Sequence, residues 1–194
     1  MRAALATLAL LAATSALAQD RNAGLVPDEM GEAMWIDLVE FDEPPIFLPA
    51  HLGSNQARYR MTISGINCHE YVFRIDHRRR GPVEGTVKMR NKCGNASSRG
   101  YTEAHFRASE AELAQLVSTM ADQRMFEIYP QYWSFADDEI ICVDGNELVF
   151  ERLDADGYRY SSANAQCGAP SGMLRAALQV IDMADVEDAR ALVQ

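Results

Sequence analysis

Apolar and polar residues alternate with a period of two in three stretches near the middle of the chain. These are ARYRMTIS (residues 57–64), CHEYVFRIDH (68–77) and VEGTVKMRNK (83–92). The apolar members are Tyr59, Met61, Ile63, Tyr71, Phe73, Ile75, Val87 and Met89. Since successive side chains of a strand point to opposite faces, the pattern predicts three half-buried strands, and residues 101–107 are predicted as a fourth.

The apolar period then lengthens to that of a helix. SEAELAQLVSTMADQRMF begins with Ser109, and Glu112 follows three residues later, which is the signature of a capping box. Apolar residues form one stripe of helical spacing at Leu113, Leu116, Val117, Met120 and Ala121. The sequence therefore predicts a helix over residues 110–125.

The second part of the chain repeats this order. EIICV (139–143), ELVFERL (147–153) and YRYSSA (158–163) are predicted strands, joined by the turns DGN and DADG. A second helix is predicted over 171–193, with Leu174, Ala177, Leu178 and Ile181 toward the core. We expect an α+β fold with one antiparallel β-sheet and two helices, and a possible duplicated strands-then-helix unit.

The N-terminal region divides into two further segments. Residues 1–18 combine Arg2, an apolar run and the small-x-small sequence Ala16-Leu17-Ala18, which predicts a signal peptide cleaved near Ala18. The mature protein is then expected in the periplasm or outside the cell. No later stretch approaches the ~20 apolar residues of a membrane span, so no transmembrane anchor is expected.

Residues 19–56 are acidic and contain prolines, and we interpret them as an N-terminal arm. Residues 57–194 are predicted to form a single α+β domain, with possible halves 57–126 and 127–194.

Four cysteines, Cys68, Cys93, Cys142 and Cys167, predict two disulfides in an exported chain. A hairpin whose turn centres on Arg80-Gly81 places Cys68 opposite Cys93. Cys142 and Cys167 have the same separation in sequence and form the second predicted pair. A single bridge between the two halves is the alternative.

Charge is distributed unevenly along an acidic chain of formal net charge −10. Residues 57–107 carry 11 Lys/Arg and 4 Asp/Glu, whereas residues 20–56 carry 8 acids and one Arg. The basic residues of the predicted strands and turn are Arg58, Arg60, Arg74, Arg78, Arg79, Arg80, Lys88 and Arg90. They predict a basic sheet face that binds an acidic protein or an anionic envelope component, whereas the overall charge disfavours specific nucleic-acid binding. The alternative is that the acidic arm lies on these strands.

Candidate chemistry is sparse. Cys68, His69 and Glu70 are consecutive, but strand geometry points neighbours to opposite faces, and a bridged Cys68 has no thiolate. Metal-ligand spacings and nucleotide-binding or hydrolase motifs do not occur in the sequence, so no metal or cofactor is expected. We expect a non-catalytic binding or interaction module. The alternative is a hydrolase-type enzyme with a dispersed active site using Glu70, His69 or His105.

Residues 60–184 resemble an uncharacterised family of exported bacterial α+β domains. The resemblance rests on YVFRI in a cysteine-bearing strand, SEAEL leading into MFEIYP, ERLDADGYR and ALQVID. This sequence lacks a second cysteine three residues after Cys68 that such domains carry. The resemblance implies an α+β fold and export, and it implies no activity.

Overall fold

The computed structural model describes residues 22–31, 34, 36–93, 100–127 and 144–194. Six strands form one antiparallel sheet in the order β4-β3-β2-β1-β5-β6. They are β1 (Asn55–Gly65), β2 (His69–Arg78), β3 (Val83–Asn91), β4 (Thr102–Ala108), β5 (Asn146–Asp154) and β6 (Gly157–Asn164). The predicted α+β class with an antiparallel sheet is confirmed.

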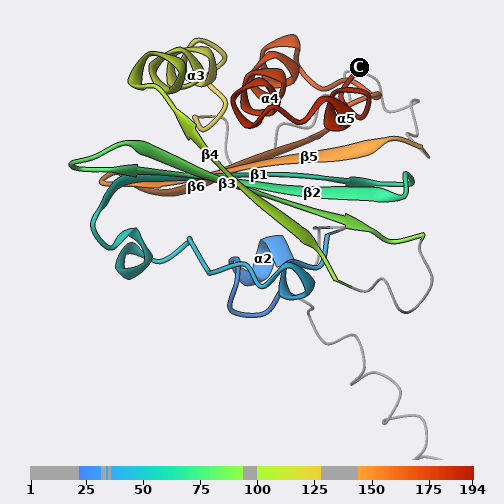
Figure 1. Ribbon diagram of the computed structural model, residues 1–194, viewed down its shortest axis with the longest axis horizontal. Helices are drawn as coiled ribbons and strands as arrows, with labels where there is room; N and C mark the ends of the chain where they lie inside the picture. The colour runs from blue at the N-terminus through green and yellow to red at the C-terminus, as the bar shows by residue number, and fades with distance from the viewer. Residues whose placement is uncertain (1–21, 32–33, 35, 94–99, 128–143) are drawn as a thin grey trace, which may run out of the picture.

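The sheet is the middle of three layers (Figure 1). Helices α3 (Glu110–Asp122), α4 (Ser171–Ala184) and α5 (Glu187–Arg190) cover one face. The described residues between 22 and 54 cross the opposite face, and we call them the arm. The arm contains the single-turn helix α2 (Asp28–Gly31) and the 3-10 helices η1 (Leu38–Phe41) and η2 (Pro49–Leu52).

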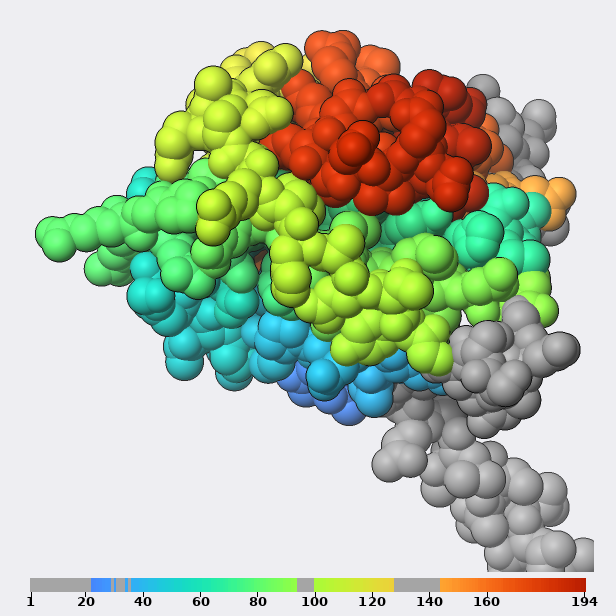
Figure 2. All heavy atoms as spheres, in the orientation of Figure 1, coloured from blue at the N-terminus to red at the C-terminus, as the bar shows by residue number. Residues whose placement is uncertain are grey.

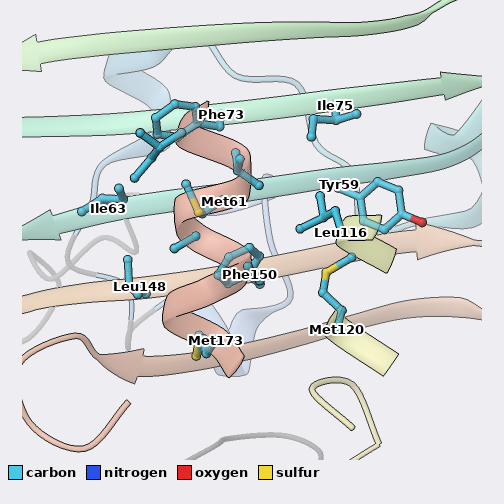
Figure 3. Packing of buried hydrophobic residues seen from close by; sticks show 14 of the residues in the cluster. Tyr59, Met61, Ile63, Phe73, Ile75, Leu116, Met120, Leu148, Phe150 and Met173 are labelled. Atoms are coloured by element: carbon cyan, nitrogen blue, oxygen red, sulfur yellow. The ribbon is translucent and has the colours of Figure 1, made fainter. Parts of the chain in front are cut away.

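The period-two pattern orients the strands as the sequence predicts. The apolar residues of β1, β2 and β5 gather beneath the helices in one core, where Leu116 and Met120 of α3 and Met173 of α4 meet them (Figure 3). Met61, Ile63, Phe73 and Ile75 are at most 2% exposed. Removal of this apolar surface from water is the main stabilisation of the helix-facing layer.

Helix α3 begins as predicted and ends earlier. The Ser109 hydroxyl accepts a hydrogen bond from the Glu112 N–H at 3.2 Å, and the Glu112 carboxylate accepts one from the Ser109 N–H at 2.7 Å. The helix stops at Asp122 rather than near residue 125, because Arg124 adopts φ 52°, a left-handed conformation that cannot continue a helix.

The last predicted helix is two helices. Asp185 has φ 54° and ends α4, and α5 follows after a short turn. The buried face of α4 consists of Gly172, Met173, Ala176, Ala177, Val180 and Ile181. Leu174 and Leu178, predicted to point inward, are only half-buried. Apolar residues surround most of this helix, so the sequence pattern alone could not fix its rotation.

The predicted Cys68–Cys93 disulfide is present, with a Cα–Cα distance of 5.0 Å. Strand β2 pairs with β3 through His69 opposite Asn91, one residue out of the predicted register. Both cysteines lie just beyond the ends of β2 and β3. The two sides of the hairpin are still hydrogen-bonded there, because the Lys92 N–H donates to the Cys68 carbonyl at 2.8 Å. The second predicted pair includes Cys142, which lies outside the described residues, so two disulfides are not confirmed.

Two other predictions also fall outside the described residues, namely the signal peptide over 1–18 and the strand over 139–143. Among the residues that are described, no helix has the length and apolar character to cross a membrane.

Candidate functional site

The sheet face beneath the arm carries charged side chains that the sequence assigned to a binding surface. Arg60 is fully buried, and its guanidinium donates to both carboxylate oxygens of Glu151 at 2.5 and 2.7 Å. It also donates to the backbone carbonyls of Pro44 at 3.1 Å and Leu25 at 3.4 Å, both in the arm. Tyr158 donates its hydroxyl to Glu151 at 2.9 Å.

The surroundings of Arg60 and Tyr158 keep both side chains protonated. Burial is the largest effect and disfavours the charged guanidinium, but the charge and hydrogen bond of Glu151, together with Glu43 and Tyr158, outweigh it and raise the pKa of Arg60. Burial, and then the Glu151 charge, raise the pKa of Tyr158, so the phenol stays protonated and donates to the carboxylate. The ion pair therefore has hydrogen-bond partners on several sides, as a buried pair requires.

Glu43 of the arm forms a second group with two basic residues of the sheet. Arg74 contacts its carboxylate at 2.8 Å and Lys88 at 3.0 Å. The Lys88 ammonium also donates to the carbonyls of Phe41 at 2.7 Å and Asp42 at 3.0 Å. The arm thus supplies one carboxylate and two backbone acceptors to a nearly buried lysine.

A third group lies toward the disulfide end of the sheet. Arg90 donates to Glu70 at 2.6 Å, pairs with Glu40 of the arm, and stacks 5.2 Å above the centre of the Phe41 ring. Burial raises the pKa of Glu70, and nearby Lys92 partly offsets this. At the other end, Arg58 pairs with Asp76 at 2.6 Å and donates to the His51 carbonyl of the arm at 2.7 Å.

Five of the eight predicted binding residues are therefore used inside the molecule: Arg58, Arg60, Arg74, Lys88 and Arg90. The alternative, in which the acidic arm lies on the basic strands, describes what the structure shows for this face. Desolvated and already paired, Arg60 and Lys88 are inaccessible to an external anion.

The other three are exposed: Arg78 ends β2, and Arg79 and Arg80 lie in the β2–β3 turn, which projects from one end of the molecule (green in Figure 2). Arg78 pairs with Glu84 at 2.6 Å. Within the described part of the chain, the side chains of Arg79 and Arg80 have no ion pair or hydrogen bond. Gly81 has φ 111°, which a residue with a side chain rarely adopts, and this conformation lets the turn close after the arginines.

A shallow polar groove of about 550 Å³ adjoins this turn on the arm side of the sheet. Its lining residues come from β2, β3 and β4, and they are Arg74, Asp76, Glu84, Gly85, Thr86, His105, Phe106 and Arg107. Glu84 belongs both to the groove and to the Arg78 pair, so groove and turn are continuous. Arg107 is exposed and forms no ion pair with a described residue, and it was not among the predicted site residues. The alternation of β4, which places Arg107 and His105 on one face, was the signal available for it.

The three residues proposed for a dispersed active site do not converge. In the register of β3, Glu70 of β2 lies opposite Arg90 and His105 of β4 lies opposite Thr86, so the two are offset by about 13 Å along the strands and separated by the width of β3 as well. His69 lies on the other face, with its ring 6.5 Å from that of Tyr71. No group of His, Cys, Asp or Glu side chains suited to a metal occurs among the described residues.

Comparison with known proteins assigns no relative to this chain: no protein-family description, no curated protein and no solved structure matches it.

Proposed function

We propose that this protein is an exported, non-catalytic binding module that holds an acidic partner at the β2–β3 turn. The observation that carries the proposal is that the arginines of the basic segment differ in whether they are already paired. Those on the sheet are paired with the arm or with neighbouring strands, whereas Arg79 and Arg80 stand exposed and unpaired at a projecting turn among the described residues.

Electrostatics supports this assignment. In a chain of net charge −10, a cationic projection creates a local positive potential that orients an approaching acidic surface. Guanidinium groups bind carboxylates and phosphates in a bidentate manner. Arg107 adds a third available cation at the adjoining groove, and Glu84 holds Arg78 in place between them.

The double substitution Arg79→Ala/Arg80→Ala should weaken retention of the partner about tenfold or more, since it removes two charges from the contact. The test is a pull-down of envelope proteins at low salt with wild type and variant, followed by affinity measurements on the protein retained. Binding should also fall as ionic strength rises.

The matched control is Arg159→Ala/Arg175→Ala, which removes two exposed arginines from β6 and α4. This variant should retain the same partners as wild type. Identical partner lists for all three proteins, or no partner for any, would contradict a binding role for the turn.

The hydrolase-type alternative has one observation in its favour. In the polar groove, His105 lies 3.3 Å from the Thr86 hydroxyl and 3.3 Å from the Glu103 carboxylate, an order that resembles nucleophile, base and orienting acid. Both distances are long, the His105 side chain is 75% exposed, and the Thr86 hydroxyl lies on a largely buried residue. Binding without catalysis is therefore the function better supported.

We propose in addition that the mature chain begins near Gln19 and contains a second disulfide, Cys142–Cys167. Export to an oxidising compartment is consistent with the Cys68–Cys93 bridge. Intact-mass analysis of the exported protein should give the mass of residues 19–194 with two disulfides. Non-reducing peptide mapping should recover a Cys142–Cys167 peptide, and a peptide joining Cys142 to any other chain position would refute the pairing.

A further inference from the structure

A groove separate from the basic turn runs between α3 and the sheet, on the helix side. It consists of two adjoining hollows of about 390 and 200 Å³ that share Tyr59 and Val117. The larger is lined by β1, α3 and the β5–β6 turn, and the smaller by the end of α3 and the residues that follow it. Together they have the size of a small-molecule site.

Tyr59 lies where the two hollows meet. Its side chain belongs to the core cluster and is only 9% exposed, and its hydroxyl points away from the other labelled core residues in Figure 3. No described residue hydrogen-bonds this hydroxyl. Burial, and then the negative charge of Asp154, raise the pKa of Tyr59, so the phenol stays neutral. The ring of Tyr59 is largely buried, whereas its hydroxyl faces the groove without a described protein partner and is therefore available to hydrogen-bond a bound molecule.

The larger hollow is negatively charged at its mouth. Glu110, Asp154 and Asp156 line it, facing one histidine, His77, which lies 3.3 Å from Glu110. Arg152 pairs with Asp154 at 3.1 Å, whereas the carboxylate of Asp156 has no partner in the described chain. The mouth thus carries three carboxylates, and the basic side chains that pair with them among the described residues are His77 and Arg152, so its net charge is negative.

The wall of the groove is apolar and comes from α3. Leu113, Ala114 and Val117 line the larger hollow, and Val117 is one of the large apolar residues left exposed, at 37%. The sequence pattern places Val117 and Ala121 in the core stripe of this helix, yet both are exposed and line the groove. The helix therefore presents part of its apolar stripe to a space that the rest of the protein does not fill.

We propose that this groove binds a small aliphatic amine. The ammonium group lies among Asp154, Asp156 and Glu110 and donates a hydrogen bond to the Tyr59 hydroxyl oxygen, and the alkyl chain lies on Val117 and Ala114. Charge complementarity selects a cation over an anion, because carboxylates predominate at the mouth. The limited volume selects a small molecule over a folded partner.

The test uses hexylamine as the probe and 1-hexanol as its uncharged counterpart, added to the ¹⁵N-labelled full chain. Hexylamine should bind with a Kd in about the millimolar range, as expected for so few heavy atoms. The amide shifts should be confined to α3, β1 and the β5–β6 turn. Hexanol should bind about fivefold or more weakly, because it lacks the charge.

Two conservative variants probe the contacts. Tyr59→Phe keeps the ring and removes only the hydroxyl, and it should weaken hexylamine binding about three- to fivefold. Asp156→Asn should weaken it about two- to fivefold. Asp122→Asn is the matched control. It removes an exposed carboxylate at the end of α3, outside the groove, and should leave hexylamine binding unchanged.

Equal binding of hexylamine and hexanol would overturn the proposal. So would amide chemical-shift changes confined to another part of the protein, or the same loss of hexylamine affinity in Tyr59→Phe, Asp156→Asn and Asp122→Asn. A lysine-containing peptide that shifts the groove residues while hexylamine does not would also overturn it, in favour of a protein partner. None of these outcomes bears on the β2–β3 turn, so this test and that of the acidic partner fail independently.

Discussion

Replacing Glu151 with glutamine should lower the free energy of unfolding by about 3–5 kcal/mol, the range observed when one partner of a buried ion pair is removed. The Arg60 guanidinium would stay fully buried with its charge uncompensated, because the remaining acceptors, the glutamine amide oxygen and two backbone carbonyls, are uncharged. Tyr158 would also lose its charged acceptor. Urea unfolding at neutral pH, compared between wild type and variant, measures the difference.

Two further variants test whether the uncompensated charge is the cause. Glu187→Gln removes a carboxylate from an exposed pair with Arg190 and should change stability by less than about 0.5 kcal/mol. The double variant Arg60→Met/Glu151→Leu removes both charges and should be more stable than Glu151→Gln alone. A double variant as unstable as Glu151→Gln would show that shape, and not charge, dominates at this position.

Truncating Phe41 to alanine should cost about 3–5 kcal/mol, as for other large side chains deleted from a well-packed core. Phe41 is fully buried between the arm and the sheet, with its ring 6.1 Å from that of Tyr101 and Arg90 stacked on it. Its carbonyl accepts a hydrogen bond from Lys88. The loss should therefore loosen the arm as well as destabilise the whole protein.

The matched control lies in the same 3-10 helix. Val39 is 59% exposed, so Val39→Ala should change stability by less than about 0.5 kcal/mol. Hydrogen exchange in the Phe41→Ala variant should increase first in residues 36–43, because local opening of the arm requires less free energy than global unfolding. Unchanged protection there would mean that the arm is held by its ion pairs and not by Phe41.

Several features could be read from single stretches of the sequence because their causes are local. Strand alternation places Met61 and Phe73 in the core, and the Ser109–Glu112 capping box marks the first turn of α3. The Cys68–Cys93 bridge could be predicted because a hairpin brings its two ends together even when the register is one residue off.

Which arginines are buried in ion pairs and which are exposed could not be predicted from single stretches of the sequence. Arg60 and Arg79 have the same chemistry and lie in one basic segment, yet one is buried against Glu151, 91 residues away, and the other is exposed. Burial depends on which distant segment covers a sheet face, and periodicity carries no information about that. The rotation of α4 and the exposure of Val117 likewise depend on which distant segments pack against each helix.

By itself, then, the sequence determined the class of fold, the strand faces, one disulfide and the uneven charge, since each depends on neighbours in the chain or across one hairpin. Tertiary structure alone decided which charges remain available. The arm pairs with most of the basic face and leaves Arg79 and Arg80 exposed, and the packing of α3 leaves the Tyr59 hydroxyl facing a groove. Pairing and burial between segments far apart in sequence are properties of the assembled layers, and they therefore determine which charged and polar groups face solvent.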